Sequence, residues 1–165
     1  MNLGKLGVWF FLDNLSSHDS AETAKKIENL GYSALWLPET VGKNPLILAS
    51  WLLSQTSNLI VATGIANIYN REPGVTLAAQ NTLAEQSNGR FLLGLGVSHK
   101  PLVEGLRGLN YGPPVKTMKE YISKVVKVKT KFHQVQPVQL CKDTISLSQL
   151  RKMSCKNIWT TLTMR

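Results

Sequence analysis

The sequence predicts an α/β protein built on a parallel β-sheet. Short segments that are apolar throughout alternate with longer segments whose apolar residues recur at helical spacing. The apolar segments begin near residues 5, 34, 59 and 91, about 29 residues apart, which suits one strand followed by one helix. Strands of this kind are typical of a sheet covered by helices. The open doubly wound sheet and the eight-stranded barrel both use this repeat, and periodicity leaves both open.

The first strand and helix are expected close to the amino terminus. Residues 5–11 (KLGVWFF) are rich in β-forming side chains and predict a buried strand. Asp19 is the expected N-cap of the next helix, because Glu22 three residues later completes a capping box. Gly31 is expected just past the end of this helix, where the backbone commonly turns left-handed.

A second strand and helix follow at the same spacing. Residues 34–37 (ALWL) predict a strand, which Pro38 ends. Asn44 and Pro45 form an N-cap and a first-turn proline, so a strongly apolar helix is expected over residues 46–53.

Two further units complete the repeating part of the chain. Residues 59–63 predict the third strand, and a polar loop over 67–73 leads into a helix over about 74–86. Asn88-Gly89 is the expected turn after this helix. Residues 91–93 predict the fourth strand.

Composition divides the chain into two parts. The 165 residues are 43% hydrophobic and 18% charged, which is ordinary for a globular domain. Residues 1–121 hold 10 Lys+Arg and 9 Asp+Glu, whereas residues 122–165 hold 9 Lys+Arg and a single Asp, so most of the net charge of +9 lies in the second part. We therefore expect one domain over residues 1–121 and a basic tail over residues 122–165.

Several classes of protein are excluded by what the sequence lacks. Two cysteines do not form a disulfide scaffold, and the histidines and cysteines show no metal-ligand spacing. No apolar stretch is long enough to span a membrane or to serve as a signal-peptide core, so a cytoplasmic location and no membrane partner are expected.

The tail interleaves lysines with valines around residues 124–131. A basic arm for nucleic acid or an anionic membrane surface is one interpretation, but no aromatic platform accompanies the lysines, so no nucleic-acid partner is expected. A native oligomerisation segment is a second interpretation. The favoured interpretation is sequence translated in a shifted frame or a fusion scar, because glycine and alanine disappear while lysine, serine and threonine increase.

Candidate site residues follow the ends of the predicted strands, because chemistry in both architectures lies at the carboxyl ends. Glu39 is a potential base or substrate ligand, or else a carboxylate that fixes a loop. His99 is a potential acid–base group, since histidine titrates near neutrality, or else a structural residue. Asn67 and Ser98 are potential ligands or turn formers.

Gly94 and Gly96 match the first two glycines of a dinucleotide-binding fingerprint, but His99 occupies the position of the third. An NAD-binding Rossmann-like domain is therefore a weaker alternative. Close approach of the backbone to a flat ligand or to a neighbouring helix explains these glycines better.

Three segments together resemble a known family. They are WLPE at 36–39, VATGIANIYNREPGVTLAAQNTLAEQSNGRFLLGLGVSH at 61–99, and PLVEGLRGLNYGPPVKTMKEY at 101–121. In order and spacing they resemble the bacterial luciferase-like flavin and deazaflavin oxidoreductases, with the greatest likeness to the branch that depends on coenzyme F-420. The resemblance covers about residues 3–121. It implies a TIM-type (βα)8 barrel, of which about four βα units are present here.

The resemblance also implies a function. Family members use reduced deazaflavin (coenzyme F-420) or FMN to act on a small-molecule substrate, either by hydride transfer or by oxygenation of paired donors with incorporation of molecular oxygen. Many carry a cis non-proline peptide after the third strand, which would fall here at Gly64-Ile65 or Ile65-Ala66. The implied catalytic residues are Glu39 and His99. The implied cofactor-binding residues are Thr63, Gly64, Ile65, Ala66, Asn67, Gly96, Val97 and Ser98.

One departure from the family affects these expectations. The family barrel continues for well over a hundred residues beyond the position of Tyr121, so half of the cofactor site is expected to be missing and activity to be weak or absent. Four parallel strands without their neighbours leave two open sheet edges, which favours association of copies into a homo-oligomer. The alternative function is a non-catalytic βα-repeat protein that binds partners through these edges or the basic tail.

Overall fold

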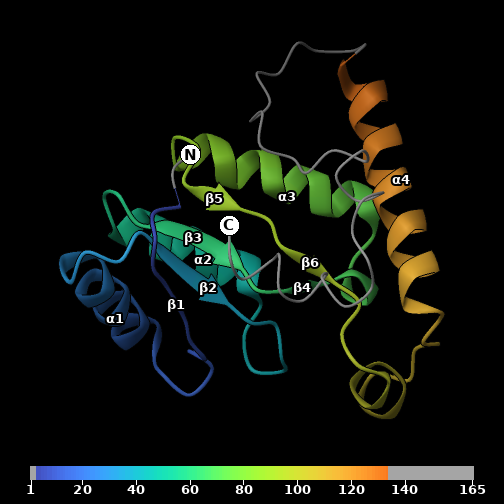
Figure 1. The fold of residues 1–165 in the computed structure, drawn as a ribbon, viewed down its shortest axis with the longest axis horizontal. Helices are drawn as coiled ribbons and strands as arrows, with labels where there is room; N and C mark the ends of the chain where they lie inside the picture. Colours follow the sequence, from blue (N-terminus) through green and yellow to red (C-terminus); the bar gives the residue numbers. More distant parts are fainter. Residues whose placement is uncertain (1–2, 134–165) are drawn as a thin grey trace.

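A computed structural model of the chain describes residues 3–133, which form a parallel sheet with helices packed against it (Figure 1). The strands are β1 (Gly7–Trp9), β2 (Ala34–Leu37), β3 (Ile60–Thr63) and β5 (Phe91–Leu92). They lie in the order β1-β2-β3-β5, and every neighbouring pair is parallel. The α/β fold with a parallel sheet, expected from the apolar repeat, is confirmed.

The third and fourth strands each continue after a short interruption. β4 (Ala66–Asn67) and β6 (Leu95–Gly96) form a second, two-stranded parallel sheet, with Ala66 opposite Leu95. The polypeptide therefore passes from β3 into β4 and from β5 into β6. The pair β4 and β6 lies beyond the carboxyl ends of β3 and β5 (Figure 1).

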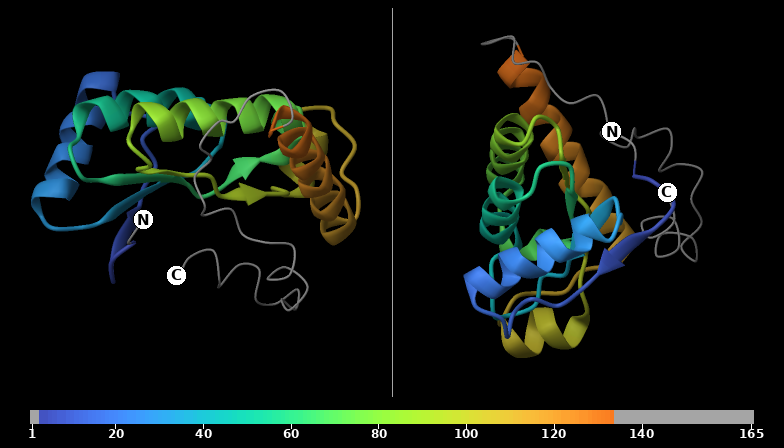
Figure 2. Two further views of the ribbon diagram at one scale, coloured as in Figure 1. Left: turned by 90° about the horizontal axis from the view of Figure 1, so that it is seen from above. Right: turned by 90° about the vertical axis from the view of Figure 1, so that its left-hand side faces the viewer.

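Three helices cover one face of the sheet, as Figure 2 shows from above. They are α1 (Ser17–Asn29), α2 (Pro45–Gln55) and α3 (Pro73–Gln86), and a fourth helix, α4 (Pro114–His133), packs on α3. Two short helical turns, η1 (Ile68–Asn70) and η2 (Pro101–Leu106), lie in the connections. The described residues thus form four successive βα units. None of their helices is long and apolar enough to cross a membrane.

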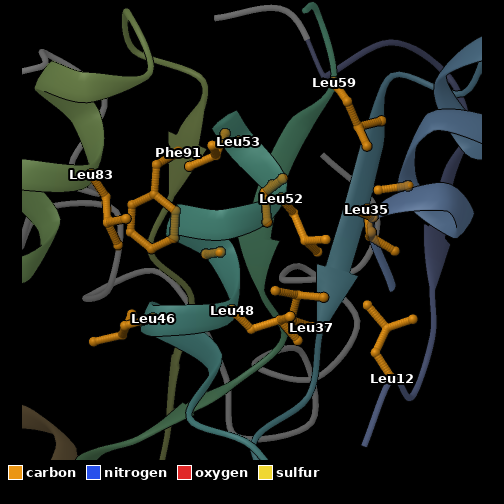
Figure 3. Packing of buried hydrophobic residues seen from close by; sticks show 14 of the residues in the cluster. Leu12, Leu35, Leu37, Leu46, Leu48, Leu52, Leu53, Leu59, Leu83 and Phe91 are labelled. Carbon is orange, nitrogen blue, oxygen red and sulfur yellow. The ribbon is translucent and has the colours of Figure 1, made fainter. Parts of the chain in front are cut away.

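The main core lies between this helical layer and the sheet (Figure 3). Leu35 and Leu37 of β2 belong to the same buried cluster as Leu52 and Leu53 of α2. All four side chains are at most 2% exposed. Burial of this much apolar surface is the dominant stabilising contribution to the fold.

The opposite face of the sheet is only partly covered by the residues that the structure describes. Trp9 is 51% exposed, and its neighbours Phe10 and Phe11 are similarly accessible. β1 and β5 are the two outer strands of the four-stranded sheet. Exposed aromatic side chains beside an open strand edge leave this surface available for further contacts.

Helix α4 packs through a second apolar cluster, in which Tyr121 and Val125 meet Ile68 and Leu77. The expected compositional boundary at Tyr121 falls inside this helix, which continues to His133. The lysine–valine segment at the start of the expected tail is therefore helical as far as that residue. The rest of the tail, residues 134–165, lies outside the described residues.

Most predicted elements are confirmed to within two residues, and the helix caps show where local chemistry was misjudged. Asn44 caps α2 as expected, through hydrogen bonds to its side-chain oxygen from the backbone N–H groups of Leu46 and Ile47. The expectation that Asp19 caps α1 is wrong. Ser16 is the N-cap, and its hydroxyl both accepts from the Asp19 N–H and donates to the Asp19 carboxylate.

Candidate functional site at the carboxyl ends of the strands

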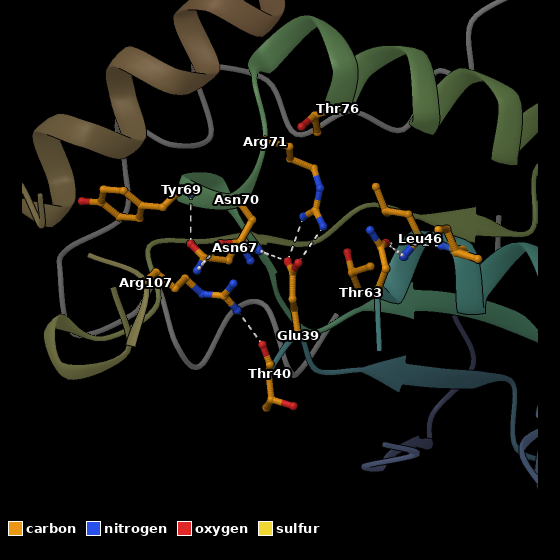
Figure 4. A network of polar contacts seen from close by, with 12 residues as sticks. Glu39, Thr40, Leu46, Thr63, Asn67, Tyr69, Asn70, Arg71, Thr76 and Arg107 are labelled. Carbon is orange, nitrogen blue, oxygen red and sulfur yellow. Dashed lines mark hydrogen bonds and ion pairs between the residues drawn. The ribbon is translucent and has the colours of Figure 1, made fainter. Parts of the chain in front are cut away.

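Glu39 lies two residues after the end of β2 and is held in place by four hydrogen bonds. Both nitrogens of the Arg71 fork donate to its carboxylate, at 2.6 and 2.8 Å, and the backbone N–H of Asn67 donates at 2.6 Å (Figure 4). The Glu39 N–H donates to the carbonyl of Ile65. The Glu39 and Arg71 side chains are only 6% and 9% exposed, so this ion pair is buried.

The electrostatic state of Glu39 follows from these contacts. Burial raises the pKa of the Glu39 carboxyl, but the hydrogen bonds and the charge of Arg71 outweigh burial, and the net pKa lies below its ordinary value. A carboxylate with a lowered pKa and both oxygens occupied is a weak proton acceptor. In this geometry Glu39 fixes the loop after β3 to the end of β2.

The segment after β3 is tied to strands on both sides. The Thr63 hydroxyl donates to the carbonyl of Gly94 at 2.8 Å and accepts from the Gly94 N–H at 2.9 Å. The Gly64–Ile65 peptide is cis, at one of the two positions that the family resemblance implied. The Gly64 carbonyl accepts a hydrogen bond of 2.7 Å from the indole N–H of Trp9.

Glycines are required here by close contacts between neighbouring segments. A Cβ at Gly94 would lie 2.1 Å from the carbonyl oxygen of Thr63, and a Cβ at Gly96 would lie 2.6 Å from the Ile65 side chain. The neighbour in these contacts is therefore the chain leaving β3, whereas the sequence suggested a neighbouring helix or a flat ligand. This packing also gives the two glycines a purpose other than binding a dinucleotide.

Asn67 is 2% exposed and closes the turn that follows it. Its side-chain oxygen accepts from the N–H of Tyr69 at 3.0 Å, and its side-chain nitrogen donates to Asn70. Ala66 pairs through its N–H with the carbonyl of Gly94. Residues 63–67 and Glu39 thus form one connected cluster.

The remaining candidate residues continue from β6. Val97 packs beside the second apolar cluster, and Ser98 adopts a positive φ of 57° while its carbonyl accepts from the Tyr111 hydroxyl. His99 is exposed and begins the turn into η2, with its carbonyl accepting from the N–H groups of Leu102 and Val103. The sequence candidates therefore divide into a buried cluster around Glu39 and an accessible edge at Ser98 and His99.

Sequence reasoning missed the residues that support this cluster. Tyr121 of α4 donates through its hydroxyl to the carbonyl of Arg71 and shares a hydrogen bond with the hydroxyl of Thr76. Burial raises the pKa of Tyr121 above its ordinary value, despite the hydrogen bond from Thr76. A buried carboxylate needs a cation nearby. Arg71, in the loop after the next strand, was therefore the sequence feature that could have predicted the partner of Glu39.

Thr40 extends the network to the other two βα loops. Its hydroxyl donates to the carboxylate of Asp13, which follows β1, and its carbonyl accepts from Arg107 at 2.6 Å. Arg107 lies beyond η2, in the connection after β6. The pair Glu39-Thr40 therefore contacts the loops that follow β1, β3 and β6. Figure 4 shows its contacts with Arg71 and Arg107. Among residues 3–133, no group of three potential metal ligands occurs.

Comparison with known proteins identifies the family of the chain. The profile of the luciferase-like monooxygenase family matches residues 6–131, which is most of the chain. The chain belongs to this family. The match extends past Tyr121 and includes most of α4, in agreement with the packing of that helix.

Individual relatives of the luciferase-like family agree. An oxidoreductase of Mycobacterium tuberculosis that is named for dependence on coenzyme F-420 is 31% identical over 129 residues, which cover 78% of this chain and 36% of the relative. The 5,10-methylenetetrahydromethanopterin reductase of Methanolobus tindarius is 28% identical over 106 residues, covering 64% of this chain and 32% of the reductase. The chain thus spans about a third of the length of these curated relatives.

Solved structures show the same fold. The coenzyme F-420 dependent tetrahydromethanopterin reductase of Methanopyrus kandleri matches with a TM-score of 0.65 and 20% identity, over 73% of this chain and 39% of the reductase. An FMN-bound Baeyer–Villiger monooxygenase component of Pseudomonas putida matches with a TM-score of 0.57 and 16% identity, over 79% of this chain and 39% of that protein. The partial barrel expected from the resemblance is confirmed.

Proposed function

We propose that the carboxyl ends of β1, β2, β3 and β6 bind the ring system of reduced coenzyme F-420 or FMN, as part of an oxidoreductase that acts on a small molecule. Membership of the luciferase-like family supports the proposal, and so do the relatives named for the deazaflavin and the FMN-bound structure. The observation that carries it within this chain is the convergence of the Glu39 cluster and an aromatic surface at the same strand ends.

The residues present suit a flat, partly apolar ligand. A Cβ at Gly64 would lie 3.3 Å from the Trp9 ring and 3.4 Å from Trp36, so the glycine keeps the backbone close to two indoles. Trp9 also contacts Phe11 edge-to-face, with ring centroids 4.7 Å apart. Aromatic side chains that are half exposed beside a bare backbone segment favour stacking of a planar ring.

The protein's part in the chemistry is then positioning and proton handling. When bound, the reduced ring supplies a hydride for a substrate carbon or imine, or reducing equivalents for oxygenation with molecular oxygen. Trp9 fixes the Gly64 carbonyl, and the Glu39–Arg71 pair fixes residues 65–67 beside it. His99 is the accessible candidate for proton transfer, because Glu39 is committed to its ion pair.

A titration of tryptophan fluorescence tests this proposal. Added F-420 or FMN is expected to quench Trp9 and Trp36 saturably, and the Trp9→Phe variant is expected to lose part of the quenching. Preference for F-420, with oxygen-independent hydride transfer, would assign the deazaflavin chemistry. Preference for FMN with oxygen consumption would assign the second candidate, oxygenation. Absence of saturable quenching by either ring would contradict the proposal.

The sheet edges provide a further element of the proposal, namely association of two copies. β1 and β5 are the outer strands, and the aromatic residues 9–11 are exposed along β1 and its continuation. A two-fold axis parallel to the strands would keep all strands of two copies parallel, while β1 of one copy pairs with β5 of the other. The unpaired N–H and C=O groups of an edge strand favour such pairing.

A further inference from the structure

Among residues 3–133, most positive charges near the carboxyl ends of the strands have partners within the protein. Arg71 is neutralised by Glu39, and Lys100 lies 3.7 Å from the carboxylate of Glu104. The Lys43 ammonium donates to the carbonyls of Leu12 and Leu15 and to the hydroxyl of Ser20. These cations have structural partners, so they are poorly suited to binding an external anion.

Arg107 differs from them. Its guanidinium makes one hydrogen bond, from Nη2 to the Thr40 carbonyl at 2.6 Å, and its Nε is buried with no hydrogen-bond partner among the described residues. No carboxylate in residues 3–133 lies within ion-pair distance of it. A partly buried guanidinium with unused donors and no counter-charge is energetically unfavourable unless an anion binds there.

Arg90 shows how a structural arginine is satisfied in the same fold. Its guanidinium donates four hydrogen bonds, to the carbonyls of Ser87, Leu59 and Leu53 and to the Thr56 hydroxyl. That arginine precedes β5 and therefore lies at the amino ends of the strands. Within residues 3–133, Arg107 has only one such contact, and it lies at the opposite end, where the ligand site is proposed.

We propose that Arg107 binds an oxyanion, a phosphate or a carboxylate, of the ligand held at the carboxyl ends of the strands. The identity of that ligand rests on the proposed function. The observation that Arg107 has no counter-ion among the described residues does not depend on the proposed function. Arginine suits this task because its planar fork makes paired, charge-assisted hydrogen bonds to oxyanions. Its hydrogen bond to the carbonyl of Thr40, the residue after Glu39, holds Arg107 beside the Glu39 cluster.

Inorganic phosphate provides a first test that needs no cofactor. The midpoint of thermal unfolding is measured in sodium phosphate and in sodium chloride of equal ionic strength, for the unmodified chain, Arg107→Gln and Lys100→Gln. Lys100 is the matched control, since it is 68% exposed and already paired with Glu104. Phosphate is expected to raise the midpoint of the unmodified chain and of Lys100→Gln, and to leave Arg107→Gln unchanged.

A second test identifies the source of the oxyanion. FMN and riboflavin share a ring and differ by one phosphate, so the ratio of their dissociation constants isolates the phosphate contact. If Arg107 binds the cofactor phosphate, Arg107→Gln lowers the preference for FMN by about tenfold. An unchanged ratio, together with a phosphate response that depends on Arg107, assigns the oxyanion to the substrate.

The outcomes separate this inference from the proposed function. A phosphate response that is absent, or equal in the unmodified chain and Arg107→Gln, overturns the role of Arg107 even if both rings bind. An Arg107-dependent phosphate response without any ring binding supports the inference and contradicts the proposed function. Should Arg107→Gln fail to fold, Arg107→Lys replaces it, and an undiminished phosphate affinity in that variant overturns the need for a guanidinium.

Discussion

Arg71 donates hydrogen bonds to both carboxylate oxygens of Glu39, at 2.6 and 2.8 Å, although α2, β3, β4 and η1 separate the two residues in the sequence. The pair joins the end of β2 to the loop after β3. Tyr121 then joins that loop to α4 through the Arg71 carbonyl. The buried ion pair thus connects two of the four βα units at the proposed ligand site, and the Tyr121 hydrogen bond connects a third.

Replacing Glu39 should therefore destabilise the whole fold. Glu39→Gln leaves the Arg71 charge buried without a counter-ion, and loss of one member of a buried pair reduces the free energy of unfolding by about 3 kcal/mol. Denaturant unfolding followed by circular dichroism measures the change. Glu22→Gln is the control, because its pair with Lys25 is exposed, and no measurable change is expected there. Equal stability of the two variants would show that the ion pair is unimportant.

The same carboxylate should make stability depend on pH. Its pKa is lower in the folded chain than the ordinary 4.5, so its contribution is present above pH 4.5 and is lost as pH falls through the folded pKa. Glu28, whose pKa is also lowered by hydrogen bonds from backbone N–H groups, adds a pH dependence of the same sign. The difference in free energy of unfolding between the unmodified chain and Glu39→Gln is therefore the quantity to follow, and it should shrink with acidification. A constant difference would contradict the lowered pKa.

The repeating architecture could be predicted from sequence because it depends on local signals. Apolar segments at regular spacing, the Asn44-Pro45 helix start and the Gly31 turn all act within a few residues. The misassigned cap of α1 shows the limit of such rules, since Ser16 and Asp19 both have capping chemistry and only the backbone path decides between them. The length of the last helix could not be predicted from composition, because the composition changes at Tyr121 while the helix continues to His133.

The site was predicted less completely because its decisive contacts are long-range. Position after a strand was enough to select Glu39, but the choice between a base and a loop-fixing carboxylate depends on Arg71, which belongs to another unit. Asn67 was expected to be a ligand or a turn former, and its side-chain oxygen caps the turn at Tyr69. Arg107 was missed because an arginine in an exposed connection has no distinguishing local pattern.

Two glycine substitutions test the close packing between the third and fourth strands. Gly94→Ala would place a methyl group 2.1 Å from the Thr63 carbonyl, so the strands must separate, and a loss of about 3 kcal/mol in the free energy of unfolding is expected. Gly105→Ala is the control, since no atom lies within 4 Å of its added methyl group. Its stability should be unchanged or slightly increased. A tolerated alanine at position 94 would refute the described contact.

Removing one hydroxyl group tests whether α4 belongs to the folded domain. Tyr121→Phe keeps the ring in its apolar cluster but removes the hydrogen bonds to Thr76 and Arg71, and about 1 kcal/mol of stability should be lost. A chain ending at residue 121 should be far less stable than one ending at residue 133, because it loses Val125 from the same cluster. Equal thermal midpoints for the two shortened chains would support the predicted domain boundary at Tyr121.

Charge on the open edge should prevent the proposed association. Phe10→Lys places a cation beside β1 on a side chain that is 44% exposed, and lysines at edge strands oppose pairing. Analytical ultracentrifugation should show dimer or larger species for the unmodified chain and a shift toward monomer for this variant. Ile47→Lys on the outer surface of α2 is the control and should not change the distribution. If the unmodified chain is monomeric at all concentrations, association through the β1 and β5 edges is excluded.

Mapping a bound ring onto the backbone tests the central claim most directly. In a nuclear magnetic resonance titration of ¹⁵N-labelled chain with coenzyme F-420 and with FMN, one ring should shift the amide signals of Gly64, Asn67, Gly96 and Ser98 at the carboxyl ends. The amides of Ser33, Asn58 and Arg90, at the amino ends of the same strands, should remain unchanged. Shifts confined to the amino ends or to the outer helices, or no shifts with either ring, would contradict the proposed ligand site.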